Sequence, residues 1–282
     1  VILPVYKKDK VDYLSKAIES IALQSYKDFH IYVGVDGPVG DDIKDYLNLI
    51  GAQSKVSIVW FEENRGLACV LNDLLETCFK EGYEYIARMD ADDISLPDRL
   101  EKQIAYFEEH PEVDVVGGAI DEIDEKGRRR KLFQGAFGII NDTGSCSVGY
   151  NILQIIVHPE TPAECRAFCS KRNPHAHPAV LFSQRFFEKA GCKYRPEYRQ
   201  NQDTMLWYDG MMAGTQHANI PDVVLKFRMT DAMFRKRRNG WAFAKKQLSD
   251  RLMINRGLGY GFGANIFGFA MFCMLVSPAW IK

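Results

Sequence analysis

Three aspartates fall within four positions of the chain, Asp90, Asp92 and Asp93, directly after the apolar run 85–87. The run predicts a buried strand, so the aspartates would lie in the loop at its carboxyl end. Carboxylates a few ångströms apart repel one another and raise each other's pKa unless a cation lies among them. A hard divalent ion with oxygen ligands, shared with a diphosphate, suits such a cluster. The sequence therefore predicts a metal site in this loop.

An acidic turn without a metal is the alternative interpretation of the same loop. Ser95 and Asp98 have the spacing of a capping box, which would open a helix at Pro97. A lone Asp-x-Asp motif is more often such a turn than a metal site. The remaining sequence favours the metal site, because other polar turns are predicted to meet this loop.

The charge balance and the cysteines exclude several functional classes. The 282 residues hold 36 lysines and arginines and 37 aspartates and glutamates, so no overall field favours nucleic acid as a partner. The seven cysteines include no Cys-x-x-Cys pair, which argues against a disulfide framework and against a zinc site. Residues 1–5 lack the cationic and long apolar regions of a signal peptide. We therefore expect a cytoplasmic protein with reduced thiols.

Residues 1–117 alternate between apolar runs typical of strands and amphipathic segments typical of helices. The predicted strands cover residues 1–5, 30–35, 56–61, 85–89 and 113–117. The predicted helices cover residues 13–24, 41–50, 97–109 and a segment that begins at residue 67. This alternation predicts an α/β fold with a mostly parallel sheet, right-handed crossovers and helices on both faces.

Polar turns follow three of the predicted strands, at residues 6–9, at Asp36-Gly37 and at residues 90–93. In open α/β sheets, ligands bind beyond the carboxyl ends of the parallel strands. We therefore expect the three turns to meet in one cleft.

The regular alternation stops after residue 120. Residues 121–131 predict a charged hairpin or loop that ends in the basic run 128–131, and residues 133–171 show no clear period. Periodicity returns in the last third, where we expect strands at 179–182 and 223–227 and helices at 183–190 and 202–212. The basic runs at 128–131 and 235–238 are either solvated surface or contacts for a diphosphate or an anionic lipid.

Several motifs occur in the order found in the family 2 glycosyltransferases, which are inverting, nucleotide-sugar-dependent enzymes of the GT-A fold. The motifs are Leu3-Pro4-Val5-Tyr6, Val35-Asp36-Gly37, Asn64-Arg65-Gly66-Leu67, Arg88-Met89-Asp90-Ala91-Asp92-Asp93, His177-Pro178-Ala179-Val180 and Gln202-Asp203-Thr204. The resemblance covers about residues 1–240 and is weakest at 133–171. Within the family, the chain resembles the bacterial exopolysaccharide and O-antigen enzymes of the amylovoran type.

The resemblance implies a nucleotide-binding role for the first motifs. The turn at Pro4, Val5 and Tyr6 and the carboxylate of Asp36 would hold the base and the ribose of the donor. Arg65 would lie in the segment that flanks the base.

The resemblance also implies a metal site and a catalytic base. Asp90 would reach the ribose or a metal-bound water, and Asp92 would be the direct ligand of Mg²⁺ or Mn²⁺. Asp203 would be the base, although the residue before it is Gln202 where the family has an acid. Read without the family, Asp203 is also a candidate N-cap of the helix that follows. His177 would border the donor diphosphate, either as a third metal ligand or as a structural histidine.

Residues 258–281 contain no charged side chain. Their length suits a membrane span, but their glycines and Pro278 weaken a simple helix. We favour an interfacial or re-entrant segment beside Arg251 and Arg256. A helix buried against the domain is the alternative.

These features predict a nucleotide-sugar-binding half (1–120), an acceptor-binding half with the catalytic base (121–240), and a C-terminal helical extension (241–282). The predicted activity is the inverting transfer of a sugar from a nucleotide-diphosphate donor to a lipid-linked saccharide acceptor, at the inner face of the cell membrane. A sugar-nucleotide pyrophosphorylase and an inactive GT-A scaffold are the alternatives. A pyrophosphorylase should have a glycine-rich loop after the first strand, where this chain has Tyr6-Lys7-Lys8-Asp9.

Overall fold

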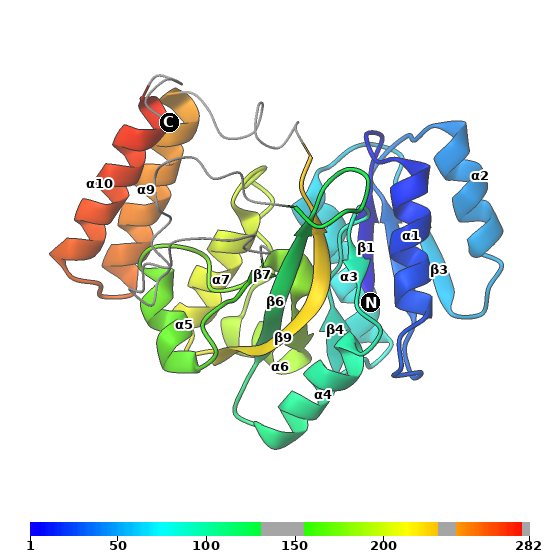
Figure 1. Cartoon of the computed structure of the whole chain (residues 1–282), viewed down its shortest axis with the longest axis horizontal. Helices are drawn as coiled ribbons and strands as arrows, with labels where there is room; N and C mark the ends of the chain where they lie inside the picture. The colour runs from blue at the N-terminus through cyan, green and yellow to red at the C-terminus, as the bar shows by residue number, and fades with distance from the viewer. Residues whose placement is uncertain (131–154, 231–240, 278–282) are drawn as a thin grey trace.

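Parallel strands from the first third of the chain form one side of the sheet (Figure 1). They are β1 (Ile2–Val5), β2 (Ile31–Val35) and β3 (Val56–Trp60), in the order β1-β2-β3. A parallel bridge between Ile2 and Arg88 joins β1 to the chain just after β4 (Tyr85–Ala87). The structure is a computed structural model, and it describes residues 1–130, 155–230 and 241–277.

The other side of the sheet has the strand order β4-β8-β6-β9-β5. Its further strands are β5 (Ile94–Ser95), β6 (Val115–Ile123), β7 (Ile155–Ile156), β8 (Leu181–Ser183) and β9 (His217–Arg228). β6 and β9 are parallel, whereas β8 is antiparallel to both β4 and β6, and β5 is antiparallel to β9. The predicted α/β fold is confirmed: the strands of the first third form a parallel sheet, and the later strands add a mixed one.

Helices cover both faces of the sheet, and each face has its own core. They are α1 (Val11–Ala22), α2 (Asp41–Ile50), α3 (Leu67–Lys80), α4 (Arg99–Glu109), α5 (Pro162–Cys169), α6 (Gln184–Ala190), α7 (Gln202–Met212), α9 (Trp241–Gly257) and α10 (Phe262–Val276). One cluster packs α1, α2 and α4 on the sheet, and a second packs α3, α6 and α7. Side chains alternate along the strands, so Ile2 and Val115 join the second cluster while Leu3 and Val116 join the first.

The helix after the acidic loop differs from the prediction. α4 begins at Arg99, and its N-cap residue, Asp98, makes no capping bond with its side chain. Ser95 lies in β5, where its hydroxyl accepts a hydrogen bond from Gln24 and its N–H donates to Ser20. The predicted capping box is therefore wrong, because Ser95 is bound in the sheet.

The region after β6 also differs in part. β6 continues to Ile123, so Asp121 lies in the strand and not in a loop. A turn follows at residues 124–128, in which the N–H of Asp124 donates to the carbonyl of Arg128 at 2.8 Å. For the basic run at 128–131, the sequence left open a solvated surface or a contact for a diphosphate or an anionic lipid. Arg129 pairs with Asp121 at 2.6 Å, so at least this arginine is part of a strand-to-turn ion pair.

One helix was not predicted at all. α5 has a complete capping box, in which Thr161 and Glu164 exchange side-chain and backbone hydrogen bonds. The segment 131–154 and the basic run 235–238 lie outside the described residues. α9 and α10 form a hairpin at the edge of the molecule (Figure 1). Among the described helices, none combines the length and the apolar character needed to cross a membrane.

Candidate active site

The carboxyl ends of β1, β2 and β4 lie side by side, as predicted. β2 and β4 flank β1, and all three run in the same direction. The N–H of Asp36 donates to the carbonyl of Val5 at 2.8 Å, and the N–H of Met89 donates to the carbonyl of Ile2 at 3.1 Å. These bonds bring the three polar turns to one edge of the sheet.

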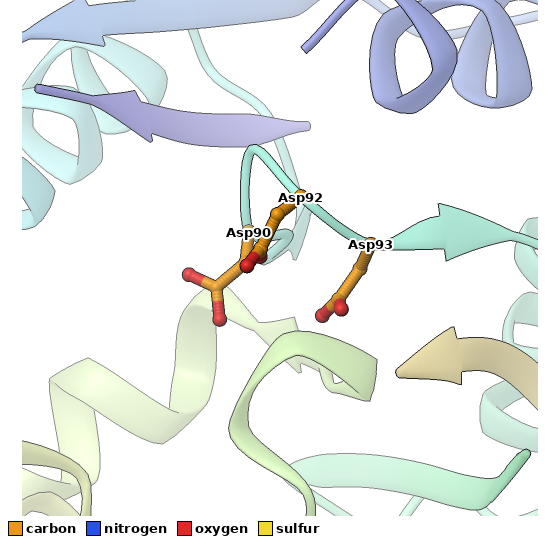
Figure 2. A group of neighbouring side chains, drawn as sticks. All are labelled: Asp90, Asp92 and Asp93. Carbon is orange, nitrogen blue, oxygen red and sulfur yellow. The ribbon is translucent and has the colours of Figure 1, made fainter. Parts of the chain in front are cut away.

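The acidic loop places three carboxylates together. Asp90, Asp92 and Asp93 each offer an oxygen, and these oxygens lie within 4.8 Å of one another. Figure 2 shows the three side chains on the same side of the loop between β4 and β5. Among the described residues, no other group of three or more acidic, histidine or cysteine side chains has the spacing of a metal site. Asp93 is an addition to the two predicted ligands.

The electrostatics of the loop suit a cation. Burial, and then the charge of nearby Asp90, raise the pKa of Asp92 to about 6. Burial, and then the charge of Asp92, raise the pKa of Asp93 well above its ordinary value. Asp93 is fully buried, and its Oδ1 accepts from the N–H of Arg228 at 2.8 Å. Its Oδ2 has no partner among the described residues. A hard divalent cation would relieve this repulsion and bind the free oxygen, so the residues fit Mg²⁺ or Mn²⁺.

Arg88 lies beneath the acidic loop with only 2% of its surface exposed. Its Nη2 donates to Asp90 at 2.5 Å, while its Nε and Nη1 have no partner among the described residues. Burial raises the pKa of Asp203 and of Tyr194, and the positive charge of Arg88 opposes the rise in each. One buried guanidinium therefore binds a candidate metal ligand and acts electrostatically on the candidate base.

Asp203 lies in the first turn of α7, and Asn201 is the N-cap residue. The N-cap interpretation of Asp203 is therefore wrong. Its Oδ2 accepts from Nδ2 of Asn173 at 3.0 Å. Burial raises the pKa of Asp203, while the bond from the N–H of Thr204 and the charge of Arg88 oppose the rise. Hydrogen bonds thus fix the Asp203 carboxylate in place, and its raised pKa makes it more basic, as a general base requires.

His177 lies in the 3₁₀ turn η1 (His177–Ala179) and is 8% exposed. Its Nε2 is 2.7 Å from the hydroxyl of Tyr194, and its ring packs against Trp207. Burial, and then the charge of Arg88, lower the pKa of His177 well below its usual value. The ring is therefore neutral and lies outside the carboxylate group. These contacts favour the structural interpretation over the third metal ligand.

Asp36 holds the loop that precedes α3. Its Oδ1 accepts from the N–H of Arg65 at 2.8 Å, and its Oδ2 accepts from the N–H of Gly66 at 3.0 Å. Nδ2 of Asn64 also donates to Oδ2 at 2.8 Å. Gly66 has a φ of 94°, which a residue with a side chain adopts only with strain. The Asn-Arg-Gly motif is therefore folded around the Asp36 carboxylate.

The remaining predicted residues line the same edge. Arg65 pairs with Asp73, and its guanidinium lies 4.4 Å from the centre of the Phe61 ring. Tyr6 is half-buried, and its N–H donates to Oδ2 of Asp9 at 2.8 Å. Of the two residues before it, Pro4 is half-buried and Val5 is 1% exposed. Val5 belongs to the core, so its side chain does not face the cleft.

Three residues of the site were missed, Arg88, Tyr194 and Arg228, whereas Asp93 belonged to the predicted acidic cluster without a ligand role. Arg88 lies inside the motif that contains Asp90, and a basic residue at the end of an apolar strand was a usable signal. Tyr194 and Arg228 come from distant segments, and no local pattern marks them.

Comparison with known proteins identifies the family. The model described as glycosyl transferase family 2 matches residues 1–164. The chain belongs to this family. The match covers β1 through α5 as far as Glu164, and it includes all three turns of the site.

Full-length relatives agree with this assignment. The chain is similar to the amylovoran biosynthesis glycosyltransferase AmsE of Erwinia amylovora, at 33% identity over 88% of this chain and 82% of that protein. It is also similar to the UDP-Gal:alpha-D-GlcNAc-diphosphoundecaprenol beta-1,3-galactosyltransferase of Escherichia coli, at 24% identity over 88% of this chain and 80% of that protein.

A solved structure supports the fold. S. aureus TarS 1–349 in complex with UDP-GlcNAc aligns with a TM-score of 0.62, over 97% of this chain and 70% of that chain. The two sequences are 13% identical, so the likeness concerns the fold alone. The predicted GT-A fold is confirmed.

Proposed function

We propose that the protein transfers a sugar, with inversion, from a nucleoside-diphosphate donor to a saccharide acceptor, using Mg²⁺ or Mn²⁺ at Asp90, Asp92 and Asp93. The observation that carries this proposal is the group of three carboxylates, Asp90, Asp92 and Asp93, whose oxygens lie within 4.8 Å of one another. A single displacement needs one group for the leaving diphosphate and another for the proton of the acceptor. The acidic loop suits the first task and Asp203 suits the second.

Asp203 would take the proton of the attacking hydroxyl. Its bond from Asn173 fixes one carboxylate oxygen and leaves lone pairs on the other for the acceptor. Its raised pKa makes it a stronger base, while Arg88 and the bond from Thr204 keep it ionised. When bound, a divalent cation would stabilise the charge that develops on the departing diphosphate.

The donor's nucleoside would lie at the edge formed by β1 and β2. Asp36 accepts hydrogen bonds from Asn64, Arg65 and Gly66 and is buried, so it would hold the base and the ribose by fixing the loop before α3. Pro4 and Tyr6 would contact the nucleoside from β1, and Arg65 from the loop. His177 would support the diphosphate end through Tyr194.

The acceptor that we propose is a saccharide on a lipid diphosphate. The name of the E. coli relative gives such an acceptor, and the name of AmsE refers to the biosynthesis of a polysaccharide. By analogy, we place this chain in polysaccharide biosynthesis at the inner face of the cell membrane. Membership of family 2 favours a transferase over the pyrophosphorylase alternative.

Donor hydrolysis tests this proposal without knowledge of the acceptor. UDP-GlcNAc and UDP-Gal are the first donors to try, with Mn²⁺ and with EDTA. We expect hydrolysis of one nucleotide sugar that depends on the metal and falls by orders of magnitude in Asp92→Asn. The matched control is Asp98→Asn, because Asp98 is an exposed aspartate nearby that is paired with Lys102. An inactive scaffold would hydrolyse no donor, and a pyrophosphorylase would release a sugar phosphate when pyrophosphate is added.

A further inference from the structure

α10 exposes an apolar stripe along one side. Phe262 is 79% exposed, Ile266 55%, Phe269 51% and Met274 49%. Phe262, Ile266 and Phe269 recur at intervals of four and three, so they lie on one face of the helix, and Met274 lies at the margin of this face. Cys273 and Ala270 on the same face are also exposed. Figure 1 shows α10 at the outer edge of the molecule, with α9 on its inner side.

The opposite side of α10 is packed and does not explain the stripe. Gly268 is buried against α9, where an added Cβ would lie 3.1 Å from Cγ of Arg251. The Phe272 ring packs on Trp241 with 5.4 Å between centroids. No described residue covers the outer stripe, and contiguous apolar surface of this kind marks an interaction site.

The exposed charges of the hairpin are basic. α10 has no charged residue, whereas α9 carries exposed Lys245 and Arg256, and Nζ of Lys246 lies 3.9 Å from the centre of the Tyr198 ring. The acid of α9, Asp250, is buried, and it accepts from Nδ2 of Asn201 at 3.0 Å and pairs with Lys246 at 3.5 Å. The solvated charge of the hairpin is therefore positive.

Charge decides between the possible occupants of the stripe. A second copy of the chain would use the same face on both molecules, which brings like basic charges together. An anionic surface would instead pair with them. We propose that the α9–α10 hairpin is a membrane-binding element, and that the stripe of α10 inserts into the surface of an anionic phospholipid bilayer.

The dimensions suit a helix that lies in the interface. Fifteen residues at about 1.5 Å each give roughly 22 Å, which is less than the ~30 Å apolar thickness of a bilayer. A helix that lies flat buries one apolar face and leaves basic residues at the headgroups. Trp241 at the start of α9 is 68% exposed, and tryptophan is enriched at this depth.

The membrane contact would bring the active site to a lipid-linked acceptor in the same bilayer, and this role rests on the proposed function. Membrane binding itself does not depend on catalysis. Binding can therefore be measured without donor or acceptor, and a failure of either proposal would be recognised separately.

The experiment is co-sedimentation of the full chain with vesicles of phosphatidylcholine containing 30% phosphatidylglycerol. We expect binding to these vesicles, and at least tenfold weaker binding to phosphatidylcholine alone. Lys245→Gln with Arg256→Gln should weaken binding about 25-fold, because each basic residue near an anionic surface contributes about 1 kcal/mol, or fivefold. Phe262→Asp with Phe269→Asp should reduce binding at least tenfold.

Leu49→Asp is the matched control, because Leu49 is a 72% exposed leucine on α2, at the other end of the molecule (Figure 1). It should bind vesicles like the unchanged chain. Circular dichroism checks the fold of each variant, and Ile266→Ser provides a milder change of the stripe. Equal vesicle binding by the stripe variants would overturn the proposal. So would a dimer in analytical ultracentrifugation that Phe262→Asp dissociates, since a second copy would then be the occupant.

Donor hydrolysis separates the two proposals. The stripe variants should keep their hydrolysis rate in solution, because no candidate catalytic residue lies in α9 or α10. Vesicle binding by a chain that hydrolyses no donor would leave the membrane contact standing and refute the proposed function.

Discussion

Replacing Asp92 by Asn should stabilise the metal-free protein and remove its response to a metal. Burial and the charge of Asp90 raise the pKa of Asp92 from 3.8 to about 6. Between these values the folded chain binds more protons than the unfolded chain, so the free energy of unfolding falls as pH rises through this window. The penalty is complete above about pH 6. At about 1.4 kcal/mol per pH unit, it amounts to about 3 kcal/mol at neutral pH.

Asparagine carries no charge and avoids this penalty. At pH 7.5 with EDTA, we expect the thermal midpoint of Asp92→Asn to exceed that of the unchanged chain by roughly 6 °C, at about 2 °C per kcal/mol for a chain of this length. At pH 4 the two midpoints should nearly coincide, since the carboxyl group is then protonated in the folded chain. Saturating Mn²⁺ should stabilise the unchanged chain by about 3 kcal/mol at 100 times the dissociation constant, and the variant by much less.

Differential scanning fluorimetry at both pH values, with and without Mn²⁺, measures all of these effects. Asp98→Asn is the control, because Lys102 lowers the pKa of Asp98, so its loss should not raise the midpoint. Equal midpoints at pH 7.5 without metal would refute the argument that the carboxylates crowd one another. A variant that gains as much from Mn²⁺ as the unchanged chain would show that Asp92 is not a ligand.

Three further changes probe the base, the central arginine and the buried histidines. Asp203→Asn should leave nucleotide-sugar affinity in calorimetry nearly unchanged and slow transfer by about 100- to 10,000-fold; a collapse of affinity would contradict the role of Asp203 as base. Arg88→Met should move the acidic limb of the pH profile of kcat/KM to higher pH, because Arg88 lowers the pKa of Asp203; an unmoved limb would rule out this coupling. His175 is buried, and its ring is hydrogen-bonded to Asn219 and His217. Burial lowers the pKa of His175 to about 3, so its contribution to stability is lost as pH falls below 6.5. The free energy of unfolding in urea should therefore fall between pH 7 and pH 5, and this fall should be about 2 kcal/mol smaller in His175→Gln. An equal fall in the variant would mean that His175 does not titrate this way.

The local elements of the first half could be predicted, because their periodicity is a property of adjacent residues. α2 has the predicted bounds, and β2 and β3 each differ by one residue at one end. β5 could not be predicted, since two residues carry no period and the strand exists only by pairing with β9. β6 extends further than expected because Asp121, which suggests a loop, is neutralised by Arg129.

The site was predictable to the extent that its residues are neighbours in sequence. The acidic loop, Asp36 and Arg65 belong to short motifs, and parallel topology brings them to one edge. The relation of Arg88 to Asp203 was not predictable from spacing, because it depends on how α7 packs against the sheet. The N-cap interpretation of Asp203 was wrong because Asn201, two residues earlier, adopts the left-handed conformation and is the N-cap residue of α7. Sequence patterns place the ends of helices only to within one or two residues.

The strand pairing that frames the acidic loop bears on how the chain becomes active during synthesis. β1, β2 and β3 pair with neighbours that are close in sequence, so they can assemble early. β4 and β5, which flank the acidic loop, pair with Leu181–Ser183 and with Leu225–Lys226. The strands on either side of the loop therefore cannot pair until the ribosome has synthesised most of the chain. A nascent chain shorter than about residue 226 could hold a partly formed sheet but no assembled metal site, so it would not consume donor before folding is complete.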